Sequence, residues 1–168
     1  MEYDCSGGEV TFRGYSLFQT AHYGYAGNLL MPDDAILSTL SQYLDIQEIL
    51  QNQNLVRDFL QKHFAPYYDG EAGVDMFVYQ EDGRHKLHPF VEVNLRKTMG
   101  LAAHDLYARY CHPEARGTFR IVHGPVGTLL ATSLQKGMHC RDGLWFSGTA
   151  VLNPVTDKTQ YAAVIELS

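Results

Sequence analysis

The sequence predicts an α+β fold, with a largely antiparallel sheet and helices packed against it. Three observations lead to this prediction. Stretches of alternating polar and apolar residues occur early, centrally and late in the chain. Runs of apolar residues at helical spacing separate these stretches. An Asp82-Gly83 pair, typical of a tight reverse turn, joins the two central stretches, so they are expected to pair as an antiparallel hairpin.

The first half of the chain is expected to begin with strands and to continue with helices. Alternation over residues 9–20 follows a Gly7-Gly8 turn, and the glycine-bearing stretch 22–31 predicts a further strand. Residues 33–64 contain two apolar stripes at helical spacing behind an acidic first turn. This pattern predicts two helices or one bent helix.

The second half is expected to begin with the central hairpin, formed by residues 73–79 and 88–96. Thr98 fits the N-cap position of a helix over 99–112, because its hydroxyl can accept a backbone N–H bond. The last elements alternate in type: a strand over 117–124, a helix that begins at Pro125 and ends before Gly137, and a closing hairpin of 143–153 with 159–167.

Composition bounds the class of protein. The chain has 168 residues, of which 45% are hydrophobic and 19% charged, so we expect one globular domain over 1–168. The net charge of -6 gives no global basic field, which argues against nucleic acid or an anionic membrane as partners. Three cysteines without a CxxC pair, no signal peptide and no apolar run of about 18 residues favour a cytoplasmic protein.

The central hairpin carries an unusual set of side chains. Glu92, Asn94 and Arg96 occupy every other position, so they share one face of the strand. If 82–85 forms a four-residue turn, Asp75 lies directly opposite Glu92. Two facing carboxylates repel each other unless a proton, a base or a metal lies between them. The apolar residues between them are expected to face the core: Val91, Val93 and Leu95. Two aromatic residues are expected on the carboxylate face: Phe77 and Phe90.

A divalent cation would resolve this repulsion. Oxygen ligands without histidine or thiolate suit Mg²⁺ or Mn²⁺ better than zinc, and Mg²⁺ completes its shell with water and substrate phosphates. Arg96 and Lys97 add positive charge where the strand gives way to a helix N-terminus, which favours an anion. This combination suits phosphoryl transfer from a nucleotide, because that reaction depends on positioning and on neutralising the transferring oxygens.

Other residues offer weaker candidates. Arg13, on the early strand, could reach a substrate carboxylate or phosphate, although a surface role is the simpler interpretation. The polar loop 19–28, which includes His22 and Tyr23, could cover a ligand pocket if its hairpin and the central hairpin share one sheet. The histidines and cysteines at 111–112 and 139–140 are adjacent pairs, which fit no usual zinc spacing.

The segments 73–79 and 88–100 resemble the C-terminal core of the ATP-grasp superfamily of carboxylate–amine and carboxylate–thiol ligases. These proteins carry an acidic residue on one strand and an E-x-N motif on the next. The resemblance implies that Asp75 is a ligand of one Mg²⁺, that Glu92 bridges two, and that Asn94 is a ligand of the second. It also implies that Arg96 touches the transferring phosphate, whereas Lys97 has no firm counterpart in the general pattern.

The same resemblance implies a reaction and its partners. In such ligases a substrate carboxylate attacks the γ-phosphate of ATP, and an amine or thiol then displaces phosphate from the acyl phosphate. An N-terminal lobe supplies lysines for the α- and β-phosphates and a linker for adenine, and this chain has no room for it. We therefore expect a C-terminal lobe of a longer protein, which is incomplete as an enzyme on its own.

Two alternatives remain open at this stage. The chain could be a noncatalytic module that keeps the ATP-grasp-like scaffold to bind a small ligand or a protein partner. It could also be a complete small domain in which the polar hairpin face is an ordinary solvated surface with a salt bridge.

Overall fold

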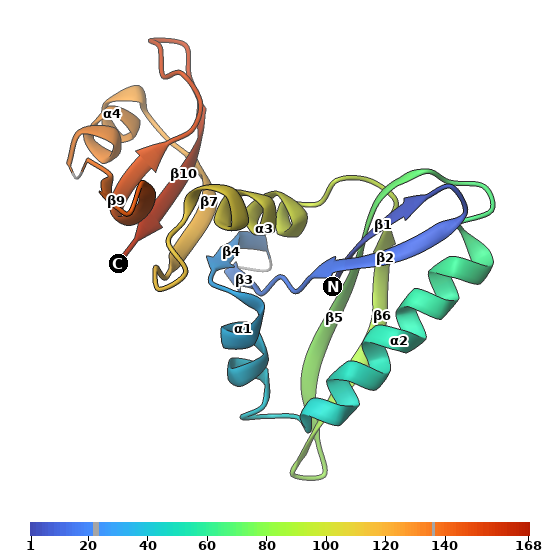
Figure 1. The fold of residues 1–168 in the computed structure, drawn as a ribbon. Helices are drawn as coiled ribbons and strands as arrows, with labels where there is room; N and C mark the ends of the chain where they lie inside the picture. Colours follow the sequence, from blue (N-terminus) through green and yellow to red (C-terminus); the bar gives the residue numbers. More distant parts are fainter. Residues whose placement is uncertain (22–23, 136) are drawn as a thin grey trace. The chain divides into compact units, whose positions relative to one another are not determined.

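This computed structural model describes residues 1–21, 24–135 and 137–168. Within them the chain forms four α-helices and ten β-strands, so the predicted α+β class is confirmed (Figure 1). The strands form two antiparallel sheets, of four and six strands, where the sequence predicted one. Two predicted loop residues, His22 and Tyr23, and Lys136 of the predicted helix lie outside the described residues.

The chain divides into two compact units. The first comprises residues 1–16 and 33–102, and the second comprises 17–32 and 103–168. The expectation of a single domain over 1–168 stays a prediction, and each unit is described by itself.

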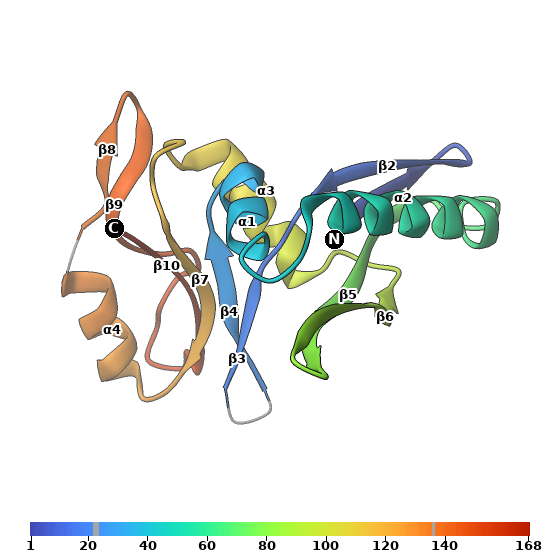
Figure 2. The same ribbon diagram turned by 90° about the horizontal axis from the view of Figure 1, so that it is seen from below.

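The first unit contains the four-stranded sheet, in the strand order β2-β1-β5-β6. Its elements are β1 (Glu2–Ser6), β2 (Glu9–Gly14), α1 (Asp33–Leu40), α2 (Ile46–His63), β5 (Gly70–Glu81) and β6 (Arg84–Asn94). The region predicted as two helices or one bent helix is thus two helices. Helix α2 runs beside β2 (Figures 1 and 2). It begins at an Asp45 cap, whose carboxylate accepts a bond from the Gln47 N–H, and its last turn is basic.

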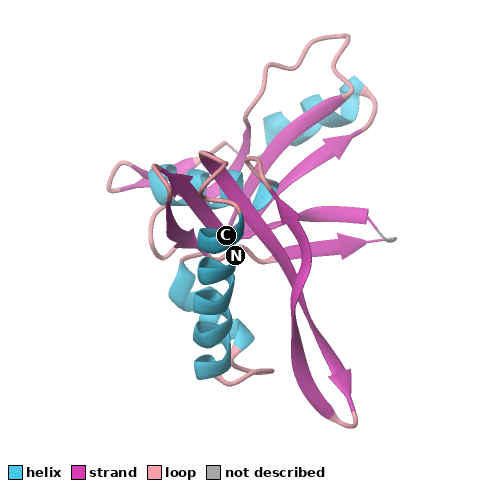
Figure 3. Cartoon of the chain, turned by 90° about the vertical axis from the view of Figure 1, so that its right-hand side faces the viewer, coloured by secondary structure: helices cyan, strands magenta, loops and turns pink. Residues whose placement is uncertain are grey.

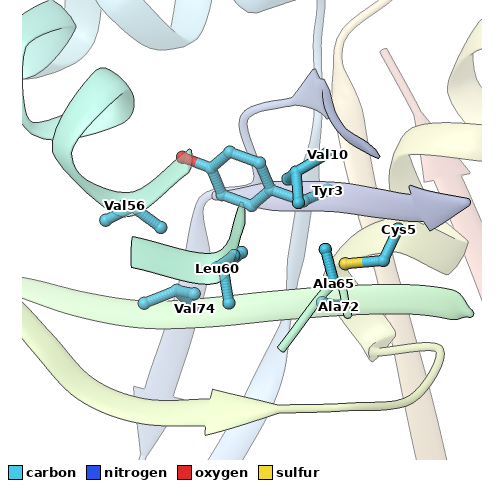
Figure 4. Close-up of a cluster of buried hydrophobic side chains, with 8 residues drawn as sticks. All are labelled: Tyr3, Cys5, Val10, Val56, Leu60, Ala65, Ala72 and Val74. Carbon is cyan, nitrogen blue, oxygen red and sulfur yellow. The ribbon is translucent and has the colours of Figure 1, made fainter. Parts of the chain in front are cut away.

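The core of the first unit lies between one face of the sheet and α2. The position of this core shows which residues of the sheet point away from α2. Side chains from β1, β2, β5 and α2 meet in this cluster, which consists of Tyr3, Cys5, Val10, Val56, Leu60, Ala65, Ala72 and Val74 (Figure 4). Because neighbouring residues of a strand point to opposite faces, Gly73 and Asp75 face away from the cluster that buries Ala72 and Val74. Asp75 therefore lies on the face that α2 does not cover.

The predicted hairpin of β5 and β6 is confirmed, but its predicted four-residue turn is wrong. The strands are joined by the two residues Asp82 and Gly83, both with positive φ, of 50° and 74°, as a type I′ turn requires. Figure 3 shows strands of the sheets joined by tight turns of this kind. Glu81 therefore pairs with Arg84, and the register continues to Phe77 opposite His88.

A bulge then changes the register of β6. Three residues, Pro89 to Val91, face Met76 alone, and the next pair is Asp75 with Glu92. Proline lacks the N–H that a ladder needs, so Pro89 favours a break in pairing here, on an edge strand. Since the bulge adds two residues, it restores the predicted pairing of Asp75 with Glu92 and the parity of the side chains.

The same bulge overturns part of the predicted core face. Of the three apolar residues expected in the core, Val93 packs against the cluster, whereas Val91 and Leu95 are exposed. Phe90 was expected on the carboxylate face, but it packs edge-on against Phe59 of α2, with ring centroids 5.0 Å apart. Phe90 and Val91 lie inside the bulge, where strict alternation does not hold, and Leu95 lies beyond the end of β6 at Asn94.

The second unit contains the six-stranded sheet, in the order β3-β4-β7-β10-β9-β8. Its strands are β3 (Phe18–Ala21), β4 (Gly24–Leu30), β7 (Gly117–His123), β8 (His139–Arg141), β9 (Leu144–Val151) and β10 (Tyr161–Leu167), and its helix α4 is Val126–Gln135. The predicted closing hairpin is confirmed as β9 with β10. The short strand β8, joined to β9 through Asp142-Gly143, was missed.

Helix α3 (Met99–Tyr110) belongs partly to each unit. Thr98 is its N-cap as predicted, because the Thr98 hydroxyl accepts a bond of 2.9 Å from the Leu101 N–H. The β3–β4 hairpin belongs to the six-stranded sheet and the β5–β6 hairpin to the four-stranded one. The two hairpins therefore do not share one sheet, which was the condition under which loop 19–28 was expected to cover a ligand pocket. No helix among the described residues has the length and apolarity needed to cross a membrane.

Candidate metal and phosphate site

Asp75 and Glu92 face each other across the β5–β6 ladder, as the sequence predicted. Directly opposite residues of an antiparallel pair have Cβ atoms about 5 Å apart, so the two carboxylates lie on one face within reach of a common cation. Asp75 is half-buried and Glu92 is exposed. The pair is thus open to solvent on one side and supported by the sheet on the other.

Asn94 stands next to this pair and is 8% exposed. Its Nδ2 donates a hydrogen bond of 3.4 Å to Asp75 Oδ2, and its Oδ1 accepts one of 2.9 Å from Arg96 Nη2. The guanidinium, the amide and the carboxylate thus form a continuous chain of three side chains. This chain fixes the orientation of Asn94 and brings positive charge close to Asp75.

The Asp75 carboxyl has a raised pKa. Burial is the main cause, because it penalises the charged form, and the negative charge of Glu92 raises the pKa further. The amino group of Met1 and the guanidinium of Arg96 oppose this shift. The carboxylate is therefore held at a free-energy cost that a nearby cation would relieve.

Arg96 and Lys97 lie on the exposed turn between β6 and α3. Lys97 Nζ is 3.1 Å from Glu71 Oε1, and Arg96 Nη1 is 3.4 Å from the carbonyl oxygen of Lys97. Both cations therefore sit just before the N-terminus of a helix of 12 residues, where backbone N–H groups also favour an anion.

Arg13 is placed differently from the other candidate residues. It is an exposed residue in a bulge of β2, between Phe12, which pairs with Tyr3, and Gly14, which pairs with Glu2. Since β2 and β6 are the two edges of the sheet, the backbones of Arg13 and Asn94 are three strand spacings apart, roughly 14 Å. The sheet brings Asp75, Glu92 and Asn94 together, and leaves Arg13 on the far edge.

Glu2 was missed in the sequence and is the most buried acid of this face. It is 4% exposed, and it pairs with Gly73 of β5, which in turn pairs with Asn94. Its Oε2 accepts a hydrogen bond of 2.7 Å from the Thr98 hydroxyl. No local pattern reveals this contact, because it joins residues far apart in the chain; the glycines at 73 and 100 are the only hint of a close approach.

The donor set fits a hard divalent cation better than zinc. The two carboxylates lie in one small region, and Mg²⁺ normally takes only one or two protein carboxylates besides water and phosphate. The Asn94 oxygen accepts a bond from Arg96, so it would have to exchange this bond for the metal. In the part of the chain that the structure describes, no group of three or more histidine, cysteine or acidic side chains could hold a metal ion.

Comparison with known proteins finds no family model, no curated protein and no solved structure that matches this chain. The resemblance to the ATP-grasp superfamily therefore stays a prediction. A functional assignment rests on the geometry of the β5–β6 hairpin and of the turn that follows it.

Proposed function

We propose that the first unit binds Mg²⁺ together with the phosphates of ATP, as the C-terminal lobe of an ATP-grasp-type ligase. The observation that carries the proposal is the pairing of Asp75 with Glu92, with Asn94 hydrogen-bonded between Asp75 and Arg96. Opposed carboxylates on the sheet face that α2 does not cover are unfavourable without a cation, so their presence next to two basic residues favours a site for metal and phosphate.

The ligand set argues for a nucleotide complex over a bare metal ion. Asp75, Glu92 and Asn94 can supply at most part of an octahedral shell, and phosphate oxygens and water would supply the rest. Arg96 can bind a phosphate with two parallel N–H groups, and Lys97 can add a point charge after leaving Glu71. When bound, Mg²⁺ would neutralise the charge on the phosphoryl group, while these side chains orient it.

An aromatic stack beyond the carboxylates supports a nucleotide base as the remaining part of the ligand. Phe77 follows Asp75 on the same strand face, and its ring stacks on His88 with a centroid separation of 5.2 Å. Phe77 is nevertheless 49% exposed, and Tyr79 lies edge-on beside it. A half-exposed flat ring offers a surface on which a purine could stack.

The reaction proposed for the longer protein is activation of a substrate carboxylate as an acyl phosphate, which an amine or thiol then attacks. In this reaction Arg96 and Lys97 would hold oxygens of the β-phosphate and of the transferring γ-phosphate, and Asp75, Glu92 and Asn94 would hold the cation. An N-terminal lobe of the kind that the resemblance implies would supply the other contacts to ATP. The cytoplasmic localisation belongs to the same proposal.

Paramagnetic NMR with Mn²⁺ tests the metal site on this chain directly. Mn²⁺ broadens nearby amide signals even at low occupancy, so weak binding by a single lobe is detectable. We expect broadening centred on the amides of 75 and 92, and its loss in both Asp75→Asn and Glu92→Gln. Glu81→Gln is the matched control, since Glu81 lies at the far end of the hairpin and forms an ion pair with Lys86 there. This variant should behave like the wild type.

The phosphate part of the proposal has its own readout. ADP should strengthen the Mn²⁺ effect in the wild type, and Arg96→Gln should remove most of this gain while leaving Mn²⁺ alone able to bind. Broadening that persists unchanged in Asp75→Asn, or that centres elsewhere in the chain, would rule out the proposed site.

A further inference from the structure

We infer that Glu2 and Thr98 form a brace that positions the Arg96–Lys97 turn for phosphate. The inference rests on the proposed function and adds two residues to it. Neither residue would touch the ligand. Both would act through the turn that carries the two basic side chains, so they are positioning residues.

The Glu2 side chain has an unusual environment. Its side chain is 4% exposed, and glutamate is almost never buried to this extent unless its oxygens are hydrogen-bonded. Glu2 Oε2 accepts the Thr98 hydroxyl at 2.7 Å, and the same hydroxyl accepts the Leu101 N–H at 2.9 Å. One hydroxyl thus connects a central strand of the sheet to the first turn of α3.

The Glu2–Thr98 brace is tightly packed on both sides. A Cβ at Gly73 would contact Thr98 Cγ2 and would lie 2.8 Å from Glu2 Oε2. A Cβ at Gly100 would contact Glu2 Oε1 and would lie 2.6 Å from the Ser16 hydroxyl oxygen. Glycine is therefore needed on both sides of the Glu2 carboxylate, and the tight fit leaves it little room to move.

The brace holds the turn between β6 and α3. β6 ends at Asn94, which is paired with Gly73, and α3 begins at Met99. Between these points Leu95, Arg96 and Lys97 are all exposed. The turn is fixed to β5 at one end by the ladder and to β1 at the other end by the Thr98–Glu2 bond. A turn anchored at both ends loses less conformational freedom when its side chains bind an anion.

The positioning role differs from a purely structural one in a measurable way. Asp75 and Glu92 are held by the β5–β6 ladder, independently of Thr98. Loss of the brace should therefore spare binding of the cation alone and should weaken the contribution of phosphate. A merely structural defect would weaken both together.

The test compares Mn²⁺ alone with Mn²⁺ plus ADP, by the same NMR titration, in four variants. Thr98→Val keeps the shape of the side chain and removes the hydroxyl. We expect its affinity for Mn²⁺ to match the wild type and the gain from ADP to fall roughly tenfold, as when outer supports of a site are removed. Thr98→Ser retains the hydroxyl and should restore the gain. Glu2→Gln retains an acceptor oxygen and should lose less than Thr98→Val.

Thr11→Val is the matched control, since Thr11 is an exposed residue of β2 and the chemical change is identical. An equal loss for Mn²⁺ and for ADP in Thr98→Val, or no loss in either, overturns the inference but leaves the proposed site intact. A Thr98→Val chain that fails to fold also counts against it unless Glu2→Gln folds and shows the selective loss. If Mn²⁺ has no effect on the amides of 75 and 92 in the wild type, the proposed function itself is overturned. If ADP does not strengthen the Mn²⁺ effect in the wild type, the phosphate role of Arg96 is overturned, and the inference with it.

Discussion

Asp75 lies directly opposite Glu92, although the turn that joins their strands has only two residues. The bulge at Pro89 supplies the two additional residues that bring Glu92 into this position. The hairpin therefore uses a local irregularity to face two acids across a ladder. When no metal ion is bound, the two carboxylates repel each other, and the free-energy cost of this repulsion can be measured.

Removal of one carboxylate should stabilise the chain when no metal is present. Asp75→Asn preserves the shape of the side chain and keeps an acceptor for Asn94 Nδ2. We expect the free energy of unfolding at about pH 7 to rise by roughly 0.2–1 kcal/mol, as for other like-charge cross-strand pairs. Urea unfolding measures this change. Asp58→Asn, which breaks a surface ion pair with Arg57, is the control and should not raise the free energy of unfolding.

The pH dependence of this gain has a definite sign. The folded chain holds the Asp75 proton more tightly than the unfolded chain, since the pKa of Asp75 is raised above its ordinary value of 3.8. Ionisation of Asp75 therefore lowers the free energy of unfolding above the raised pKa. Well below pH 3.8 the carboxyl is protonated in both the folded and the unfolded chain, so this effect is absent. The advantage of Asp75→Asn should shrink as the pH falls through this window. An advantage that grows toward acid pH would contradict the assignment.

Gly73 should not tolerate a methyl group. A Cβ there would contact Thr98 Cγ2 and approach Glu2 Oε2 to 2.8 Å, so Gly73→Ala is expected to lower the free energy of unfolding by about 1–3 kcal/mol. The double variant with Thr98→Ser lacks the Cγ2 atom and should recover part of this loss. Gly124→Ala, where a Cβ would have no neighbour within 4 Å, should change the urea midpoint little.

The contrast between Leu60 and Leu55 tests the face that α2 presents to the sheet. Leu60 is fully buried in the cluster of Figure 4, and Leu55 of the same helix is 53% exposed. We expect Leu60→Ala to lower the free energy of unfolding by about 2–5 kcal/mol and Leu55→Ala by less than about 0.5 kcal/mol. Similar losses in the two variants would show that α2 does not pack on the sheet through this stripe.

The order of elements and the key pairing could be predicted because both depend on local patterns. Alternation located the central strands, the Asp-Gly pair located the turn, and Thr98 located the start of α3. The turn length could not be fixed in this way, because Asp-Gly allows turns of different length. The pairing of Asp75 was therefore correct for an incomplete reason: two omitted residues at Pro89 offset two that were wrongly given to the turn.

The support of the site could not be predicted, because it depends on contacts between distant parts of the chain. Glu2 follows the first residue, and nothing in its sequence neighbours indicates that β1 lies between β2 and β5. The division into two sheets is equally invisible, since alternation predicts strands and does not identify their partners. Only the burial of Glu2 against Thr98 shows that the first strand supports the turn that carries Arg96.

Phe77 should affect nucleotides and leave phosphate alone unaffected. If a purine stacks on the exposed side of the Phe77 ring, Phe77→Ala should reduce the gain from ADP in the Mn²⁺ titration and should not reduce the gain from pyrophosphate, which has no base. The stacking energy of a single aromatic contact, about 1 kcal/mol, corresponds to a loss of roughly fivefold. Tyr67→Ala removes a ring that is 90% exposed and should leave both gains unchanged. Equal losses for ADP and pyrophosphate in Phe77→Ala would place the defect in the hairpin itself and would exclude the ring as the contact for the base.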